Sequence, residues 1–176
     1  MSKKRVFVDT NAILPCVSVG EWRRLCGQYS VETVTAVIEE TQRGDTSRRK
    51  YVVVERKMLL ETLTSTHELT HKDRADFMDR LKQKEPSLEM DPGERDLLAW
   101  VLAHERPALD TLILTTSDRA AIRACCALGW GDYLVSLERL LKEAGSQPKA
   151  LGQLDEHLRE AWLTQVRTGF RLGLIR

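Results

Sequence analysis

The sequence predicts an α/β fold in which a central parallel sheet is flanked by helices in three layers. Two short apolar runs, Arg5–Asp9 and Thr111–Thr116, are typical of strands that are buried on both faces. Helical stretches separate such runs along the chain, and this alternation is typical of parallel sheets wrapped by helices. The chain has 176 residues, which favours a single domain with an appendage.

The first quarter of the chain predicts two strands and two helices. Arg5–Asp9 is the first strand, and Ser18 is a suitable N-cap for a helix that ends near Gly27. The run Val31–Val34 predicts the second strand. A helix then begins at about Thr35 and is expected to end at residue 44, because glycine commonly follows a helix end.

Residues 45–90 form an enlarged segment that we expect to be helical in two pieces, because it contains no glycine and a single proline. The valines at 52–54 argue against a helix at that point, because β-branched side chains disfavour helices. The apolar residues that mark the inner faces are Tyr51, Val54, Met58 and Leu59 in the first piece and Phe77, Met78 and Leu81 in the second.

The remainder of the domain, up to residue 144, alternates again. Asp91 and Pro92 suit the cap and first turn of a helix. After the strand Thr111–Thr116, a helix stops at Gly129, a short strand covers 133–135 and a helix covers 137–144.

Residues 145–176 form the C-terminal extension. Gly145–Pro148 is a predicted linker, and Phe170–Arg176 alternates between apolar and polar residues. Between them, spacings of three and four residues predict an amphipathic helix through Leu154, Leu158, Ala161, Trp162 and Val166.

Composition restricts the environment and the partners. The formal net charge is +1, so contact with nucleic acid would depend on local basic patches. No run approaches the ~20 apolar residues that span a bilayer, and no signal peptide is evident. We therefore expect a cytoplasmic protein without a membrane partner, whose four cysteines are reduced.

Acidic residues from four separate segments are expected at one edge of the sheet. Asp9 and Asp118 each follow a predicted strand, and ligands bind at the carboxyl ends of parallel strands. The helix before the second long strand runs antiparallel to the sheet, so its first turn lies at this edge too. The candidates are Asp9, Glu39 or Glu40, Glu94 or Asp96, and Asp118.

Such a cluster needs either raised pKa values or a cation. Two carboxylates about 4 Å apart repel each other by about 4 kcal/mol even at an effective dielectric constant of about 20. Mg²⁺ and Mn²⁺ prefer oxygen ligands, and they can activate water and neutralise charge on a phosphodiester. The sequence therefore leaves two alternatives at this edge: acids with raised pKa values, or a Mg²⁺ or Mn²⁺ site of the kind that can serve phosphodiester hydrolysis.

Four pieces of the chain, taken in order, resemble the PIN-domain family of metal-dependent nucleases. The resemblance spans roughly Arg5 to Leu141 and is interrupted by the enlarged segment. The pieces are Val8-Asp9-Thr10-Asn11-Ala12-Ile13-Leu14, Val37-Ile38-Glu39-Glu40, Gly93-Glu94-Arg95-Asp96 and Leu114-Thr115-Thr116-Ser117-Asp118.

The resemblance implies a nuclease that uses Mg²⁺ or Mn²⁺ to cut single-stranded or structured RNA. Many small bacterial members are toxins, so an antitoxin-like protein is an implied partner. The enlarged segment and the extension depart from the compact toxin members. The implied ligands are Asp9, Glu40 in preference to Glu39, Glu94 or Asp96, and Asp118, with Asn11 and Thr116 orienting them.

Each acid also has a structural interpretation. Asp9 suits a turn at the start of the next segment, Asp118 suits the cap of the next helix, and Glu94 suits a helix start. Asp96 suits the positive end of a helix dipole, and Glu40 suits a solvated helix face. The matching alternative function is a binding or scaffold module that keeps the fold without cleaving anything.

A rival motif is His67-Glu68-Leu69-Thr70-His71, which matches the zinc-protease pattern H-E-x-x-H. That chemistry needs both histidines on one helix face. Thr70 with Asp73 instead predicts a new helix start, which would break the shared face.

A receiver-type signalling domain would need paired acids near the first strand and a lysine that ends a later strand, and neither is evident.

Basic residues gather in two places whose default interpretation is a solvated helix face. The first group lies near Glu40, where it could hold a phosphate backbone. We expect Trp162 and Phe170 to form intramolecular cover or a homodimer contact rather than a base-stacking platform. The groups are Arg43, Arg48, Arg49, Lys50, Arg56 and Lys57, and in the extension Arg159, Arg167, Arg171 and Arg176.

Overall fold

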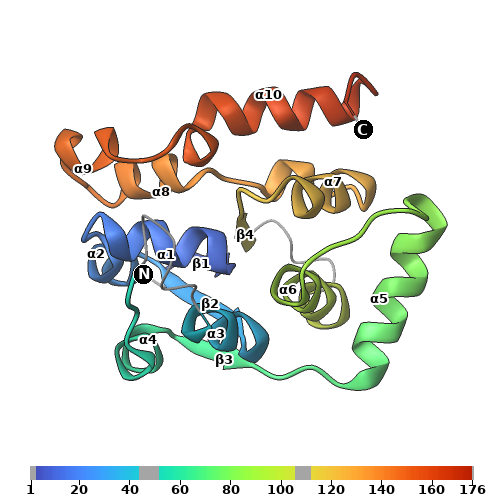
Figure 1. Cartoon of the computed structure of the whole chain (residues 1–176), viewed down its shortest axis with the longest axis horizontal. Coiled ribbons are helices and arrows are strands. Elements are labelled where there is room, and N and C mark those ends of the chain that lie inside the picture. The colour runs from blue at the N-terminus through green and yellow to red at the C-terminus, as the bar shows by residue number, and fades with distance from the viewer. Residues whose placement is uncertain (1–2, 44–51, 106–111, 176) are drawn as a thin grey trace.

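The computed structural model describes residues 3–43, 52–105 and 112–175, and their centre is a four-stranded parallel sheet (Figure 1). The strands are β1 (Arg5–Val8), β2 (Ser30–Val34), β3 (Ser65–His67) and β4 (Leu112–Thr115). They are arranged in the order β3-β2-β1-β4, and each neighbouring pair is parallel. The predicted central parallel sheet, flanked by helices, is confirmed.

The apolar runs form strands because the sheet is covered on both faces. Val6, Phe7 and Val8 of β1 are completely buried. Leu112 and Leu114 of β4 are almost completely buried. Burial of such side chains is the main favourable contribution to folding, worth roughly 1.5–3 kcal/mol for each one. β1 therefore lies at the centre of the core, with β2 on one side and β4 on the other.

Helices surround this sheet and bring distant segments together. α3 packs against α1 and α6, α5 packs against α6, and α10 lies against α7 and α8 (Figure 1). None of the helices in the described ranges is both long enough and apolar enough to cross a bilayer. Their bounds are α1 (Thr10–Ser18), α2 (Trp22–Gln28), α3 (Thr35–Gln42), α4 (Arg56–Thr62), α5 (His71–Lys84), α6 (Pro92–His104), α7 (Arg119–Ala127), α8 (Leu137–Glu143), α9 (Pro148–Gly152) and α10 (Glu160–Arg171), with the short 3-10 helices η2 (Gly131–Tyr133) and η3 (Glu156–Leu158).

The strand order reverses between β1 and β4. From β1 the chain moves to β2 and then outward to β3, and it later returns to place β4 on the other side of β1. In open α/β sheets, ligands bind outside the carboxyl ends of the strands at such a reversal. Asp9 directly follows β1, and residues 116–118 directly follow β4, so both lie at this point.

The first helices differ from those predicted. A helix was expected to start at Ser18, but Ser18 is the last residue of α1, and α2 begins only at Trp22. The cause is Asp9, whose side chain accepts a hydrogen bond from the Ala12 N–H and so caps α1 directly after β1. Pro15 lies inside α1 and hides this helix from a pattern-based prediction.

The enlarged segment contains a strand that the sequence did not reveal. The two predicted helices are present as α4 and α5, but β3 lies between them and pairs with β2. The three residues of β3 are Ser65, Thr66 and His67, so no apolar alternation marks this strand. Residues 44–51 lie outside the described ranges, and with them the predicted helix end at residue 44 and the position of Tyr51.

The C-terminal half needs two corrections. The strand expected at 133–135 is reduced to one parallel bridge between Leu114 and Leu134, next to η2. The expected amphipathic helix begins later than predicted, since α10 starts only at Glu160. It ends at Arg171, inside the tail that was predicted to alternate between apolar and polar residues. Thr111, the first residue of the predicted strand 111–116, lies outside the described ranges.

The extension packs onto the same core as the rest of the chain. Leu154, Leu158, Leu163 and Val166 are buried within the hydrophobic cluster that contains the sheet. The predicted linker is also anchored, because the buried hydroxyl of Ser146 donates a hydrogen bond to Glu21. The extension is therefore fixed beside α7 and α8 rather than tethered loosely.

Candidate functional site

Four carboxylates gather near the carboxyl ends of β1 and β4, and we call Asp9, Glu40, Glu94 and Asp118 the acidic rim. Asp9 is the N-cap of α1, Asp118 is the N-cap of α7, and Glu94 lies in the first turn of α6. Helix N-termini carry partial positive charge, which favours nearby anions. Three converging helix N-termini thus allow the fold to hold these acids together.

Asp9 and Glu94 are buried and only half satisfied. Asp9 is completely buried, and its Oδ1 accepts a hydrogen bond of 2.8 Å from the Ala12 N–H. Glu94 Oε1 accepts one of 2.9 Å from Asn11 Nδ2. Within the described residues, the second oxygen of each carboxyl group, Asp9 Oδ2 and Glu94 Oε2, is buried without a partner at hydrogen-bond geometry, although the Thr116 hydroxyl lies close enough to Asp9 to lower its pKa. Such acceptors are costly unless a proton or a cation satisfies them.

The pKa values of these two acids are raised because both are buried among like charges. Burial raises the pKa of Asp9 to about 8, and Glu94 and Asp118 add to this, while the Thr116 hydroxyl and the Ala12 N–H oppose it. Burial likewise raises the pKa of Glu94 to about 7, with Glu40 and Asp118 adding to the rise. At neutral pH the acidic rim therefore favours a bound proton or a cation.

These shifts predict that the metal-free protein loses stability as the pH rises. In the unfolded chain the pKa values are 3.8 for Asp9 and 4.5 for Glu94, so the folded state binds more protons up to about pH 7–8. Over that window the free energy of unfolding should fall by up to about 1.4 kcal/mol per pH unit for each group. Urea denaturation in EDTA between about pH 5 and about pH 8 measures this. Asp9→Asn should flatten the profile, and an equally steep profile would contradict the assignment.

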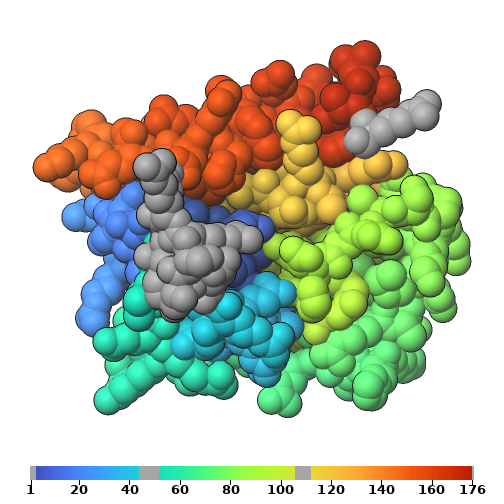
Figure 2. Space-filling model, in the orientation of Figure 1, coloured from blue at the N-terminus to red at the C-terminus, as the bar shows by residue number. Residues whose placement is uncertain are grey.

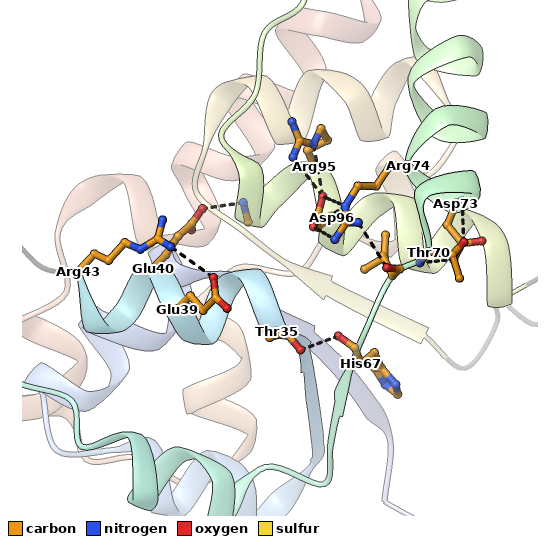
Figure 3. Close-up of polar contacts among 12 residues, drawn as sticks. Thr35, Glu39, Glu40, Arg43, His67, Thr70, Asp73, Arg74, Arg95 and Asp96 are labelled. Carbon is orange, nitrogen blue, oxygen red and sulfur yellow. Dashed lines mark hydrogen bonds and ion pairs between the residues drawn. The ribbon is translucent and has the colours of Figure 1, made fainter.

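Glu40 reaches the N-terminus of α6, whereas Glu39 is turned toward Arg43 on its own helix (Figure 3). Glu40 Oε1 accepts a hydrogen bond of 2.6 Å from the Gly93 N–H, and Oε2 accepts one of 2.7 Å from the Thr10 hydroxyl. Glu39 is exposed and pairs with Arg43 on its own helix. Glu40 thus joins α3 to the N-termini of α1 and α6.

Asp96 is paired with two arginines, so the geometry favours Glu94 over Asp96 as the candidate ligand from this segment. It is held between Arg74 of α5, at 2.9 Å, and Arg95, at 3.3 Å (Figure 3). Asp96 follows Glu94 by two residues, so the two side chains leave α6 about 200° apart. Glu94 therefore lies with the other acids, and Asp96 links α5 to α6.

Thr116 and Asn11 both contact acids of the rim. The Thr116 hydroxyl accepts a hydrogen bond of 3.1 Å from the Asp118 N–H, and it lowers the pKa of Asp9. Asn11 has an exposed side chain and donates to Glu94. Asp118 is partly exposed, and its Oδ1 accepts a hydrogen bond of 2.8 Å from the Ala121 N–H.

Sequence reasoning missed Thr10 and Gly93 as parts of the site. A Cβ atom added to Gly93 would overlap the Glu40 carboxylate, so glycine at this position lets the carboxylate approach the backbone closely, and any larger residue would require Glu40 to shift. The available signal was a glycine in the first turn of a helix, where it is unfavourable unless a close approach requires it. Its partner, Glu40, is 53 residues away, and no local pattern identifies it.

The zinc-protease motif does not have the arrangement that its chemistry requires. His67 ends β3, while His71 is the first residue of α5. Thr70 and Asp73 form a capping box at the start of α5 (Figure 3). The His67 Nε2 atom lies 2.8 Å from a carboxylate oxygen of Glu32, and its ring stacks on Trp100 with centroids 3.8 Å apart. His67 thus belongs to the packing of the sheet edge.

The basic group near Glu40 offers few unpaired charges in the part of the chain that is described. Arg43 pairs with Glu39, and Lys57 pairs with Glu61, each along its own helix. Residues 48–50, which carry the centre of this predicted group, lie outside the described ranges. Exposed pairs of this kind contribute little to stability, about 0.3–0.5 kcal/mol each.

The donors of the acidic rim fit a hard divalent cation. They are carboxylate oxygens, two of them buried and unpartnered, and oxygen donors suit Mg²⁺ and Mn²⁺. Across the described residues, no three His, Cys, Asp or Glu side chains are already closed around a common point as a metal-binding group. Ion binding would therefore draw the carboxylates of the rim closer together.

Comparisons with models of protein families, with curated proteins and with solved structures found no match. The chemistry of the acidic rim and the fold that positions it are therefore the basis for assigning a function.

Proposed function

We propose that this chain is a metal-dependent nuclease of the PIN type, which hydrolyses phosphodiester bonds of single-stranded or structured RNA. The observation that carries this proposal is the pair of buried, unpartnered oxygens on Asp9 and Glu94 at the strand-order reversal. Glu40 and Asp118 complete the set of acids. A buried acceptor without a partner is rare in folded proteins, and a bound ion is one explanation for it.

Each residue of the site has a distinct task in the proposed reaction. Asp9, Glu40, Glu94 and Asp118 would hold Mg²⁺ or Mn²⁺, which when bound supplies activation of water and neutralises charge on the phosphodiester. Asp9 and Glu94 would have to give up any bound proton in order to hold the ion. Thr10 and Gly93 fix the direction of Glu40, and Asn11 fixes Glu94. The exposure of Asn11 and the partial exposure of Asp118 leave the rim open to a strand from solvent.

The proposal is tested by incubating the purified full-length chain with end-labelled single-stranded RNA and Mn²⁺. We expect cleavage with Mn²⁺ or Mg²⁺ and none with EDTA. Cleavage of single-stranded DNA of the same sequence, measured in parallel, shows whether the protein prefers ribose or deoxyribose in its substrate. If RNA and DNA both stay intact with Mn²⁺, the nuclease proposal is rejected and a binding module becomes the better account.

Two neighbouring glutamates provide a matched pair of variants. Glu40→Gln keeps an oxygen for the Gly93 N–H but removes a charge from the rim, so we expect cleavage to fall about a hundredfold, or ~3 kcal/mol. Glu39→Gln removes the same charge from an exposed position one residue away and should leave the rate within about twofold. Initial cleavage rates at saturating Mn²⁺ measure both. Equal rates in the two variants would exclude Glu40 from the site.

A further inference from the structure

A surface beside the acidic rim is built jointly by α7 and the C-terminal extension. Arg119, the first residue of α7, directly follows Asp118. Its guanidinium carbon lies 5.9 Å from the centroid of the Trp162 ring on α10. His157, from η3, approaches the same ring edge-on, with centroids 6.3 Å apart. We call these three residues the Arg119–Trp162 surface.

The extension reaches the carboxyl end of β4 as well as α7. His157 and Leu158 line a small enclosed space together with Ala12, Thr116 and Ser117. In Figure 2 the C-terminal residues, coloured orange to red, lie along one side of the molecule against the gold residues of α7. The Arg119–Trp162 surface is thus continuous with the loop that carries Asp118.

Arg119 differs from most arginines nearby in its lack of an ion pair. Arg123 pairs with Glu85, and Arg171 pairs with Asp132. Arg119 is exposed and has no carboxylate partner within the described ranges, where its contact is the Trp162 ring. A guanidinium held over an aromatic ring keeps its N–H donors free for a phosphate. Arg167 on α10 also donates to something other than an acid, because its guanidinium donates a hydrogen bond to the Gly131 carbonyl.

We propose that Arg119, oriented by Trp162, binds a phosphate of a single-stranded nucleic acid and guides the strand to the acidic rim. This inference rests on the proposed nuclease function. The rim is acidic and repels phosphates, so a cation next to it is needed to hold the backbone. The exposed His157 ring beside Trp162 also offers a surface for an unstacked base. The extension would therefore complete the substrate-binding surface.

The test measures binding of fluorescently labelled single-stranded RNA to the full-length chain in EDTA at several KCl concentrations. Arg119→Ala should weaken binding about tenfold and reduce the slope of log K against log salt by about 0.7, the value for one phosphate contact on a single strand. Arg80→Ala removes an exposed arginine from α5 and should leave both quantities unchanged. Trp162→Leu should weaken binding in wild-type protein but add nothing to Arg119→Ala, because the two residues act together.

The possible results separate this surface from the nuclease activity. If Arg119→Ala binds RNA like the wild type with the same salt slope, the proposed phosphate contact of Arg119 is rejected, even when the wild type cleaves RNA. If the wild type binds RNA through Arg119 but does not cleave it with Mn²⁺, the surface stands and the nuclease proposal fails. Absence of RNA binding by the wild type overturns the surface. A sedimenting dimer that dissociates on Trp162→Leu also overturns it, because Trp162 is then a subunit contact.

Discussion

Replacing Asp9 with asparagine should lower RNA cleavage about a hundredfold or more, a loss of roughly 3 kcal/mol at the transition state. Asparagine keeps the side-chain volume and an oxygen that can accept the capping hydrogen bond from the Ala12 N–H. It removes the charge that a cation would bind. Single-turnover cleavage rates with Mn²⁺ measure the effect.

The same substitution should stabilise the metal-free protein at pH 8. Ionised Asp9 is completely buried with its Oδ2 unpartnered, so losing this charge removes a desolvation cost. Less activity together with a higher melting temperature in EDTA is characteristic of an acid kept for function. Asp79→Asn, at an exposed position on α5, is the control and should change neither quantity. Unchanged cleavage by Asp9→Asn would remove this residue from the site.

Adding one methyl group at Gly93 should have nearly as large an effect as removing the charge of Glu40. The new Cβ atom of Gly93→Ala would lie 2.3 Å from Glu40 Oε2 and 2.7 Å from its Cδ. The Glu40 carboxylate must then shift, and we expect the shift to disturb its hydrogen bonds to the Gly93 N–H and the Thr10 hydroxyl. We expect cleavage to fall about a hundredfold, as for Glu40→Gln.

Two comparisons show whether this loss acts through Glu40. The double variant Gly93→Ala/Glu40→Gln should be no less active than either single variant, because both changes disable one carboxylate. Gly27→Ala is the matched control, since Gly27 lies inside α2 with open space around its Cα. It should leave cleavage unchanged and the stability equal or slightly higher. Fully additive losses at Gly93 and Glu40 would refute the contact as the cause.

The parts of the fold that were predictable are those whose pattern is local. Continuous apolar runs mark β1 and β4. The start of α6 is marked by Pro92, which directly follows the capping residue Asp91. β3 could not be recognised, because Ser65, Thr66 and His67 form a strand only by pairing with β2. α1 was hidden, because the residues after Asp9 equally suit a turn.

The site divides in the same way. Asp9 and Asp118 follow from the rule for strand ends, because both come after a buried strand. The choice between Glu94 and Asp96 depends on which neighbours α6 meets, and Arg74, on a different helix, takes Asp96. Likewise, the choice of Glu40 over Glu39 depends on the close approach of Gly93. Contacts between elements far apart in the chain decide these roles, and no local sequence pattern contains them.

The central claim is that Asp9 and its neighbouring acids hold a divalent cation. Calorimetric titration of the metal-free, full-length chain with Mn²⁺ tests it most directly, with Asp9→Asn and Asp79→Asn titrated in parallel. We expect saturable binding to the wild type and to Asp79→Asn, and binding at least about tenfold weaker to Asp9→Asn, a difference of ~1.4 kcal/mol. Absence of Mn²⁺ binding by the wild type, or equal binding by Asp9→Asn, would contradict the account.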